Sequence, residues 1–102
     1  EVKKVYLLKS TESTYKIGVS VNPRERLKNI QTGNDKEINI VATYESEYAN
    51  KIEKTIHKYL SSYKQNGEWF DLSIKEEVDF IKTCKFVENN IRILKESGNP
   101  FI

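Results

Sequence analysis

The sequence pattern that most restricts the fold is a pair of short strand-like segments followed at once by a helix start. Residues 15–21 alternate apolar with polar or small side chains, as a strand with one buried face does. Residues 4–9 form a shorter apolar run, and the polar cluster between the two predicts a hairpin. Asn22 and Pro23 then suit the N-cap and first position of a helix, with Glu25 completing a capping box. The chain is therefore predicted to begin with two antiparallel strands and a helix.

The remaining segments predict one more strand and two more helices. The first helix should end near Gly33, and residues 38–44 alternate again as a third strand. Residues 47–62 predict a second helix, and a capping box that begins at Ser73 starts a last helix with a break near 83–85. This order predicts an α+β fold, a small antiparallel three-stranded sheet flanked by helices.

Chain length and composition indicate a single domain. The chain has 102 residues, of which 37% are hydrophobic and 31% are charged, enough for one modest core. We expect residues 1–102 to form one domain, with its core in residues 3–83 and a C-terminal helix and tail in 84–102. The sequence does not begin with methionine, and we expect it to be part of a longer protein whose other domains supply specificity.

The distribution of charge and of cysteine restricts the classes of partner. The net charge is only +2, but residues 1–36 hold eight Lys or Arg against four acids. That excess suits a basic face that meets phosphate, although ordinary surface scatter would also produce it. Cys84 is the sole cysteine, which excludes an internal disulfide and favours a buried hydrophobic role. No apolar run approaches the roughly 18 residues of a membrane span, so we expect an intracellular protein with no membrane partner.

The second predicted helix carries a glutamate where an apolar residue is expected. Its core stripe consists of Ala49, Ile52, Ile56, Leu60 and Tyr63. Glu53 falls inside this stripe, and His57 lies one turn further on at its edge. Glutamate is almost never buried without a partner. Glu53 should therefore face a lysine or arginine inside the protein, or a cleft in which the Glu53 and His57 pair could hold a metal.

The predicted hairpin carries a second unusual group on the face opposite its apolar row. If the apolar rows of both strands point the same way, Tyr6, Lys16 and Gly18 share the other face. Glycine would leave a gap there for close approach of a ligand or backbone. A phenol, an ammonium group and an open glycine could together handle a phosphate. Alternatively, Tyr6 is a packed aromatic residue and Lys16 a solvated charge.

Together these residues resemble the GIY-YIG nuclease superfamily, and more closely its branch in phage and prophage proteins. The resemblance covers roughly residues 3–83. Its motifs are the first triplet ending in Tyr6, the second triplet Lys16-Ile17-Gly18, the pair Arg26-Leu27, the turn Thr32-Gly33-Asn34, the pair Glu53 and His57, and the run Gly67-Glu68-Trp69-Phe70. The chain departs from the family pattern at two points: the first triplet has no glycine, and Lys16 replaces the second tyrosine.

The resemblance implies a divalent-metal-dependent DNA endonuclease. Glu53 would hold one Mg²⁺ or Mn²⁺ ion, Arg26 would stabilise charge on the phosphate, and Tyr6 would accept a proton from the attacking water. A phenol holds its proton at neutral pH, and Lys16 would supply the positive charge that Tyr6 needs to act as a base. His57 would act as a general acid or base, or would position Glu53.

Other residues receive supporting roles, and other functions remain open. Arg24 and Lys28 are expected to contact DNA, Gly18 to serve backbone packing, and Trp69 and Phe70 to clamp the last helix. The first alternative function is a catalytically weak or inactive DNA-binding module on the same scaffold, and the second is a structural or protein-interaction domain. DNA cleavage separates the first alternative from an enzyme, and salt-sensitive DNA binding separates the second from both.

Overall fold

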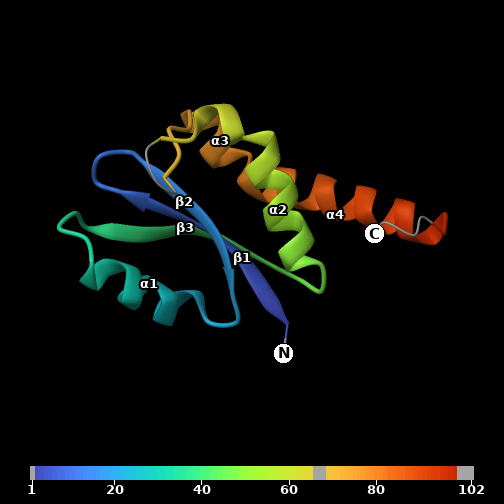
Figure 1. The fold of residues 1–102 in the computed structure, drawn as a ribbon, viewed down its shortest axis with the longest axis horizontal. Coiled ribbons are helices and arrows are strands. Elements are labelled where there is room, and N and C mark those ends of the chain that lie inside the picture. The colour runs from blue at the N-terminus through green and yellow to red at the C-terminus, as the bar shows by residue number, and fades with distance from the viewer. Residues whose placement is uncertain (1, 66–68, 99–102) are drawn as a thin grey trace.

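The predicted hairpin forms two of the three strands of an antiparallel sheet in the computed structural model, which describes residues 2–65 and 69–98 (Figure 1). β1 (Lys3–Ser10) pairs with β2 (Tyr15–Ser20) on one side and with β3 (Ile38–Ser46) on the other. The strand order is β2-β1-β3, so β2 is an edge strand. All three strands were predicted, β1 from its short apolar run and β2 and β3 from the alternation of a half-buried strand.

Helices cover both faces of this sheet (Figure 1). α1 (Pro23–Thr32) lies on one face, and α2 (Ala49–Tyr59) and α4 (Phe80–Glu96) lie on the other. A short 3-10 turn, η1 (Ser61–Tyr63), follows α2, and the one-turn helix α3 (Ile74–Val78) precedes α4. The predicted α+β class is confirmed. No helix among residues 2–65 and 69–98 is long and apolar enough to cross a bilayer.

The helix ends differ from the prediction in three places. Asn22 caps α1 by accepting from the Glu25 N–H, but its own N–H donates to Ser20 Oγ at 3.0 Å, so Glu25 does not complete a capping box. The predicted second helix ends at Tyr59, and the 3-10 turn leaves Tyr63 exposed. The capping box at Ser73 is confirmed, but the last helix breaks at Asp79 and not near 83–85.

The sheet separates two hydrophobic clusters. The larger lies beneath α2 and α4 and contains Val5, Leu7, Ile17, Ile52, Ile56, Phe70, Phe80, Cys84 and Ile91 among others. Burial raises the pKa of the Cys84 thiol to about 12, in keeping with its predicted hydrophobic role. The smaller cluster lies beneath α1 and consists of Tyr6, Leu8 and Ile38, with Leu27, Ile30, Ile40 and Trp69 packed against them. Trp69 and Phe70 thus pack on opposite faces of the sheet, and only Phe70 packs with the last helix as predicted.

A β-bulge divides β3 between the two clusters. Leu7 pairs with Ala42 but its neighbour Leu8 pairs with Ile40, which leaves Val41 as an extra residue. Strict alternation would place Ile38, Ile40, Ala42 and Tyr44 on one face. Because of the bulge, Ile38 and Ile40 instead join the α1 cluster, whereas Ala42 and Tyr44 join the larger one.

One carboxylate ties the start of the hairpin turn to α3. Glu77 accepts a hydrogen bond from the Tyr15 hydroxyl and another from Lys9 Nζ, the latter at 2.9 Å. These two hydrogen bonds hold the pKa of Glu77 below its ordinary value of 4.5. The unfolded chain therefore takes up this proton at a higher pH than the native protein does. The stability that Glu77 contributes is present above pH 4.5 and is lost as the pH falls through its lower folded pKa.

We expect Glu77→Gln to lower the free energy of unfolding by about 1 kcal/mol at pH 7, and this deficit to shrink as the pH falls through the lowered pKa of Glu77, because protonation removes the same charge from the native protein. Urea unfolding of both proteins across this range measures the difference. Glu37→Gln is the control, since the exposed Glu37 carboxylate has no hydrogen bond or ion pair within the described chain. A Glu77→Gln deficit that stays constant with pH would contradict the assignment.

Candidate functional site

The phenol of Tyr6 is held inside the α1 cluster, with its ring against Gly18 of the edge strand. The two residues are direct partners in the β1–β2 ladder, and Tyr6 is only 3% exposed. A Cβ atom placed on Gly18 would lie 2.3 Å from Tyr6 Oη and 2.5 Å from Tyr6 Cζ. The sequence predicted an open gap beside this glycine. The structure fills the gap with the Tyr6 ring itself.

The Tyr6 hydroxyl reaches solvent although its ring is buried. It makes no hydrogen bond within the chain that the structure describes. No fully enclosed side-chain nitrogen or oxygen in that part of the chain lacks a partner, so the Tyr6 oxygen must be accessible. Lys16 pairs with Leu8 and therefore shares the Tyr6 face, as predicted. Lys16 Nζ lies 5.8 Å from the centroid of the Trp69 ring.

Glu53 and His57 approach the same strand from its other face. His57 Nε2 lies 2.8 Å from the carbonyl oxygen of Ile17, which can only accept, so this nitrogen carries the proton. The His57 ring also packs edge-on against Phe70, with centroids 5.1 Å apart. Glu53 Oε1 is 3.7 Å from His57 Nε2, and the two side chains are 29% and 26% exposed respectively. Glu53 thus lies at the rim of the buried stripe and not inside it, and His57 is the titratable side chain beside it.

Two of the predicted site residues therefore touch one point of β2 from opposite sides. The Tyr6 ring contacts Gly18 from the α1 face, and His57 binds Ile17 from the α2 face. Because β2 is the outermost strand of the sheet, no strand among residues 2–65 and 69–98 pairs with it at this point. The structure thus places a free phenol hydroxyl and a half-exposed carboxylate on the two faces of one strand edge.

Arg26 is exposed on α1, and its direction follows from the helix geometry. Gln31 marks the flank of α1 that faces β3, since its side-chain oxygen accepts the Ile38 N–H at 2.8 Å. At 100° per residue, Arg26 lies roughly 140° around the axis from Gln31, with Leu27 and Ile30 between them against the sheet. Arg26 therefore projects from the β2 flank. No hydrogen bond or ion pair joins Tyr6, Arg26 and Glu53 to one another within the described residues.

The groups present suit a metal ion only if water and substrate complete its shell. Residues 2–65 and 69–98 contain no cluster of three His, Cys, Asp or Glu side chains that could hold an ion. Mg²⁺ often binds one or two carboxylates, several waters and substrate phosphates. The half-exposed Glu53 carboxylate fits that kind of site and not a cage made by the protein alone. Gly67 and Glu68, which belong to one of the motifs of the resemblance, lie outside the described residues.

A basic groove runs between α1 and the sheet, on the Tyr6 face. It has a volume of about 750 Å³, and its cationic side chains are Lys4 from β1 and Arg24 and Lys28 from α1. Sequence reasoning identified Arg24 and Lys28 but missed Lys4, which comes beside them only because β1 crosses beneath the helix. Leu27, Ile40 and Thr43 also line this groove.

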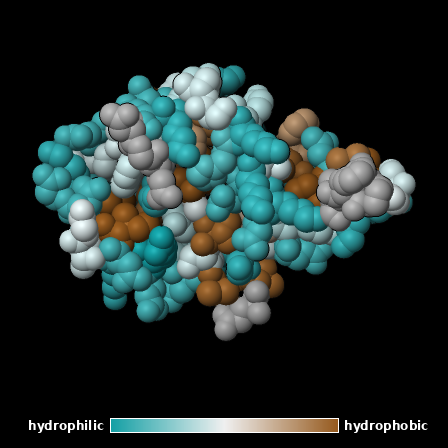
Figure 2. All heavy atoms as spheres, in the orientation of Figure 1, coloured by the Kyte–Doolittle hydropathy of each residue, from teal (hydrophilic) through white to brown (hydrophobic). Residues whose placement is uncertain are grey.

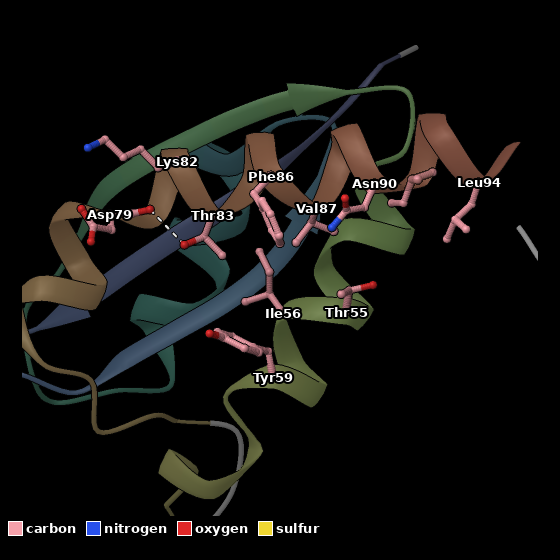
Figure 3. Close-up of a pocket in the computed structure, with 11 residues that line it drawn as sticks. Thr55, Ile56, Tyr59, Asp79, Lys82, Thr83, Phe86, Val87, Asn90 and Leu94 are labelled. Carbon is pink, nitrogen blue, oxygen red and sulfur yellow. Dashed lines mark hydrogen bonds between the residues drawn. The ribbon is translucent and has the colours of Figure 1, made fainter. Parts of the chain in front are cut away.

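A second groove, between α2 and α4, is apolar and was not predicted (Figure 3). It has a volume of about 490 Å³, and Thr55, Ile56 and Tyr59 of α2 face Thr83, Phe86 and Val87 of α4 across it. None of the predicted site residues lines it. In the space-filling view, hydrophobic residues form separate patches among hydrophilic ones, one of them toward the α4 end of the molecule (Figure 2). We place the candidate site at the β2 edge, because the titratable side chains lie there.

The structure defines a small α+β domain with a candidate site at a sheet edge. Residues 3–88 match the family model of the T5orf172 domain, and the chain belongs to that family. The prediction of a GIY-YIG nuclease was therefore wrong at the level of family, because the model that matches is that of the T5orf172 domain. The motifs that suggested the resemblance are short, and the match over residues 3–88 outweighs them.

A curated viral protein is similar to most of this chain. It is the "Putative KilA-N domain-containing protein 315L" of Invertebrate iridescent virus 6, which is 36% identical over 80 residues. The matched region covers 71% of this chain and 33% of that protein, so the chain spans about a third of the relative's length. No solved structure matches the chain.

Proposed function

We propose that this domain hydrolyses phosphodiester bonds of DNA beside the edge strand β2. The observation that carries the proposal is the approach of Tyr6 and the Glu53–His57 pair to residues 17 and 18 from opposite faces of that strand. A buried ring with an accessible, unbonded hydroxyl is a rigid group that can exchange a proton with a bound molecule. On the other face, the partly exposed Glu53 carboxylate supplies negative charge, and a cation bound there could also contact a phosphate.

The side chains have distinct roles in this proposal. Tyr6 takes the proton of the attacking water, and Lys16 places a positive charge on the same face of the sheet. Arg26, on the β2 flank of α1, grips the phosphate and stabilises the added charge. His57 is a positioning residue, since its bond to the Ile17 carbonyl fixes the ring beside Glu53. Glu53 would hold a single Mg²⁺ or Mn²⁺, which when bound supplies Lewis acidity toward the phosphate.

Nicking of supercoiled plasmid DNA in the presence of Mg²⁺ or Mn²⁺ tests this function. We expect Glu53→Gln to lower the nicking rate by at least about 100-fold, the size of effect seen when a charge-stabilising group is lost. Because Glu53 is half-exposed and off the core stripe, the variant should unfold at nearly the wild-type urea concentration. Glu37→Gln, which removes an exposed carboxylate elsewhere, should nick normally.

A DNA-binding module without catalysis is the second candidate. It is favoured by the three cations of the α1 groove and by the lack of a three-ligand metal cluster among the described residues. Wild-type protein that binds plasmid but never nicks it would establish this second function and reject the first. Equal nicking by wild-type and Glu53→Gln proteins would remove Glu53 from the mechanism.

A further inference from the structure

The groove beneath α1 has the charge of a polyanion site. Arg24 and Lys28 lie one helical turn apart on the same side of α1, and neither has an ion pair within the described residues. Lys4 reaches the groove from β1 and stands 4.0 Å from Glu45, an exposed pair of little strength. Three cations from two elements thus line a single depression, and two of them are not neutralised by the protein.

The lining of the groove indicates which part of a nucleic acid it would contact. None of the described residues that line it is aromatic. Proteins that bind single strands usually stack the bases on aromatic side chains, which this groove does not offer. Charged and polar side chains without a stacking surface suit the sugar–phosphate backbone, which carries its charge on the outside of a duplex.

The groove and the proposed cleavage point share one face of the sheet but lie on opposite flanks of α1. Tyr6 pairs with Thr43, which lines the groove, on one side and with Gly18 of the β2 edge on the other. At 100° per residue, Arg24 and Lys28 lie on the same flank of α1 as Gln31, toward β3, whereas Arg26 lies on the β2 flank. A backbone held by the cations would therefore lie on the β3 flank, and α1 separates it from the Tyr6 hydroxyl.

We propose that the groove formed by Lys4, Arg24, Lys28 and Thr43 binds the phosphate backbone of duplex DNA on the β3 flank of α1. This inference rests on the proposed function, since it names where that substrate binds. It also makes binding separable from cleavage. The cations lie on α1 and β1, whereas Glu53 lies on α2, on the opposite face of the sheet.

The test compares wild-type protein with the double substitution Arg24→Gln and Lys28→Gln. The affinity of each for a short DNA duplex is measured by fluorescence anisotropy between about 50 and 200 mM salt. We expect binding to weaken about 10-fold or more at the lower salt concentration, and the slope of log affinity against log salt to fall by about 2, because two phosphate contacts are lost. A single strand of the same sequence should bind more weakly than the duplex.

A matched control is available on the opposite face. Lys54 and Lys58 are exposed on α2 with the same four-residue spacing, so Lys54→Gln with Lys58→Gln removes equal charge. This control should leave affinity and salt slope unchanged. Equal effects of the two double variants, tighter binding of the single strand, or no duplex binding by the wild-type protein would each overturn the inference.

The outcomes also separate the inference from the function. If Glu53→Gln stops nicking while the Arg24 and Lys28 variant binds duplex normally, the groove assignment fails and the proposed function stands. If no protein nicks DNA but the groove variant loses affinity and salt slope, the backbone site stands and the hydrolase proposal fails.

Discussion

Phe70→Ala should lower the free energy of unfolding by about 3–5 kcal/mol, the usual cost of removing a fully buried phenyl ring. Phe70 is 0% exposed in the larger cluster. Its N–H donates to the Tyr15 carbonyl at 2.7 Å, and its own carbonyl accepts from the Tyr15 N–H at 2.9 Å. The ring joins the start of β2 to α4 and supports His57, so its loss leaves a cavity between three elements. The total free energy of unfolding of a small domain is only about 5–15 kcal/mol, so the variant should be close to unfolding.

Urea unfolding followed by circular dichroism measures this loss, with Phe86→Ala as the control. Phe86 is the same residue type on α4, but it is 67% exposed at the apolar groove. Its truncation should cost no more than about 0.5 kcal/mol, as at most surface positions. If the two alanine variants were equally stable, Phe70 would not have the structural role assigned to it.

Gly18→Ala should have the second largest effect and lower the free energy of unfolding by about 2–3 kcal/mol, although it adds a single methyl group. The new Cβ would lie 2.3 Å from Tyr6 Oη and 2.5 Å from Cζ, well inside contact distance. The Tyr6 ring is packed among the residues of the α1 cluster and cannot swing away without disturbing them. Since the displaced group is the proposed base, cleavage of DNA should be lost together with stability.

A double-mutant cycle with Tyr6→Leu attributes this cost to the ring. Once the phenol is gone, Gly18→Ala should cost less than about 1 kcal/mol, because alanine is otherwise acceptable in a strand. Gly33→Ala is the glycine control, since the nearest atom to its added Cβ is 4.0 Å away. An unchanged penalty in the Tyr6→Leu background would show that the backbone at Gly18, and not the tyrosine, resists the substitution.

Much of the fold could be predicted because local rules decide it. Alternating side chains predicted β2 and β3, and a short apolar run predicted β1. Asn22 and Pro23 predicted the start of α1, and the Ser73 capping box predicted the start of α3. Helix ends were less accurate, since a 3-10 turn after Tyr59 and a break at Asp79 depend on packing between elements that lie far apart in sequence. The α+β class follows from the order of elements and was correct.

The candidate site was predicted less completely, because spacing along the chain does not determine which face of the sheet a helix covers. Tyr6 and Lys16 share a face as expected, but α1 and α2 lie on opposite faces, so Glu53 and Arg26 reach the strand edge from different sides. The contact of Tyr6 with Gly18 needs a pairing register that no single residue reveals. The family was also misassigned from short motifs, and their catalytic roles stay predictions.

The extra residue at position 41 has a consequence for how this domain can vary. Before this residue, the apolar side chains of β3 pack beneath α1. After it, the apolar side chains of β3 pack beneath α2 and α4. Deletion of that one residue would move the side chains of half of β3 to the opposite face of the sheet, since a one-residue shift in register exchanges the faces of all side chains beyond it. The length of β3 is therefore fixed near this point.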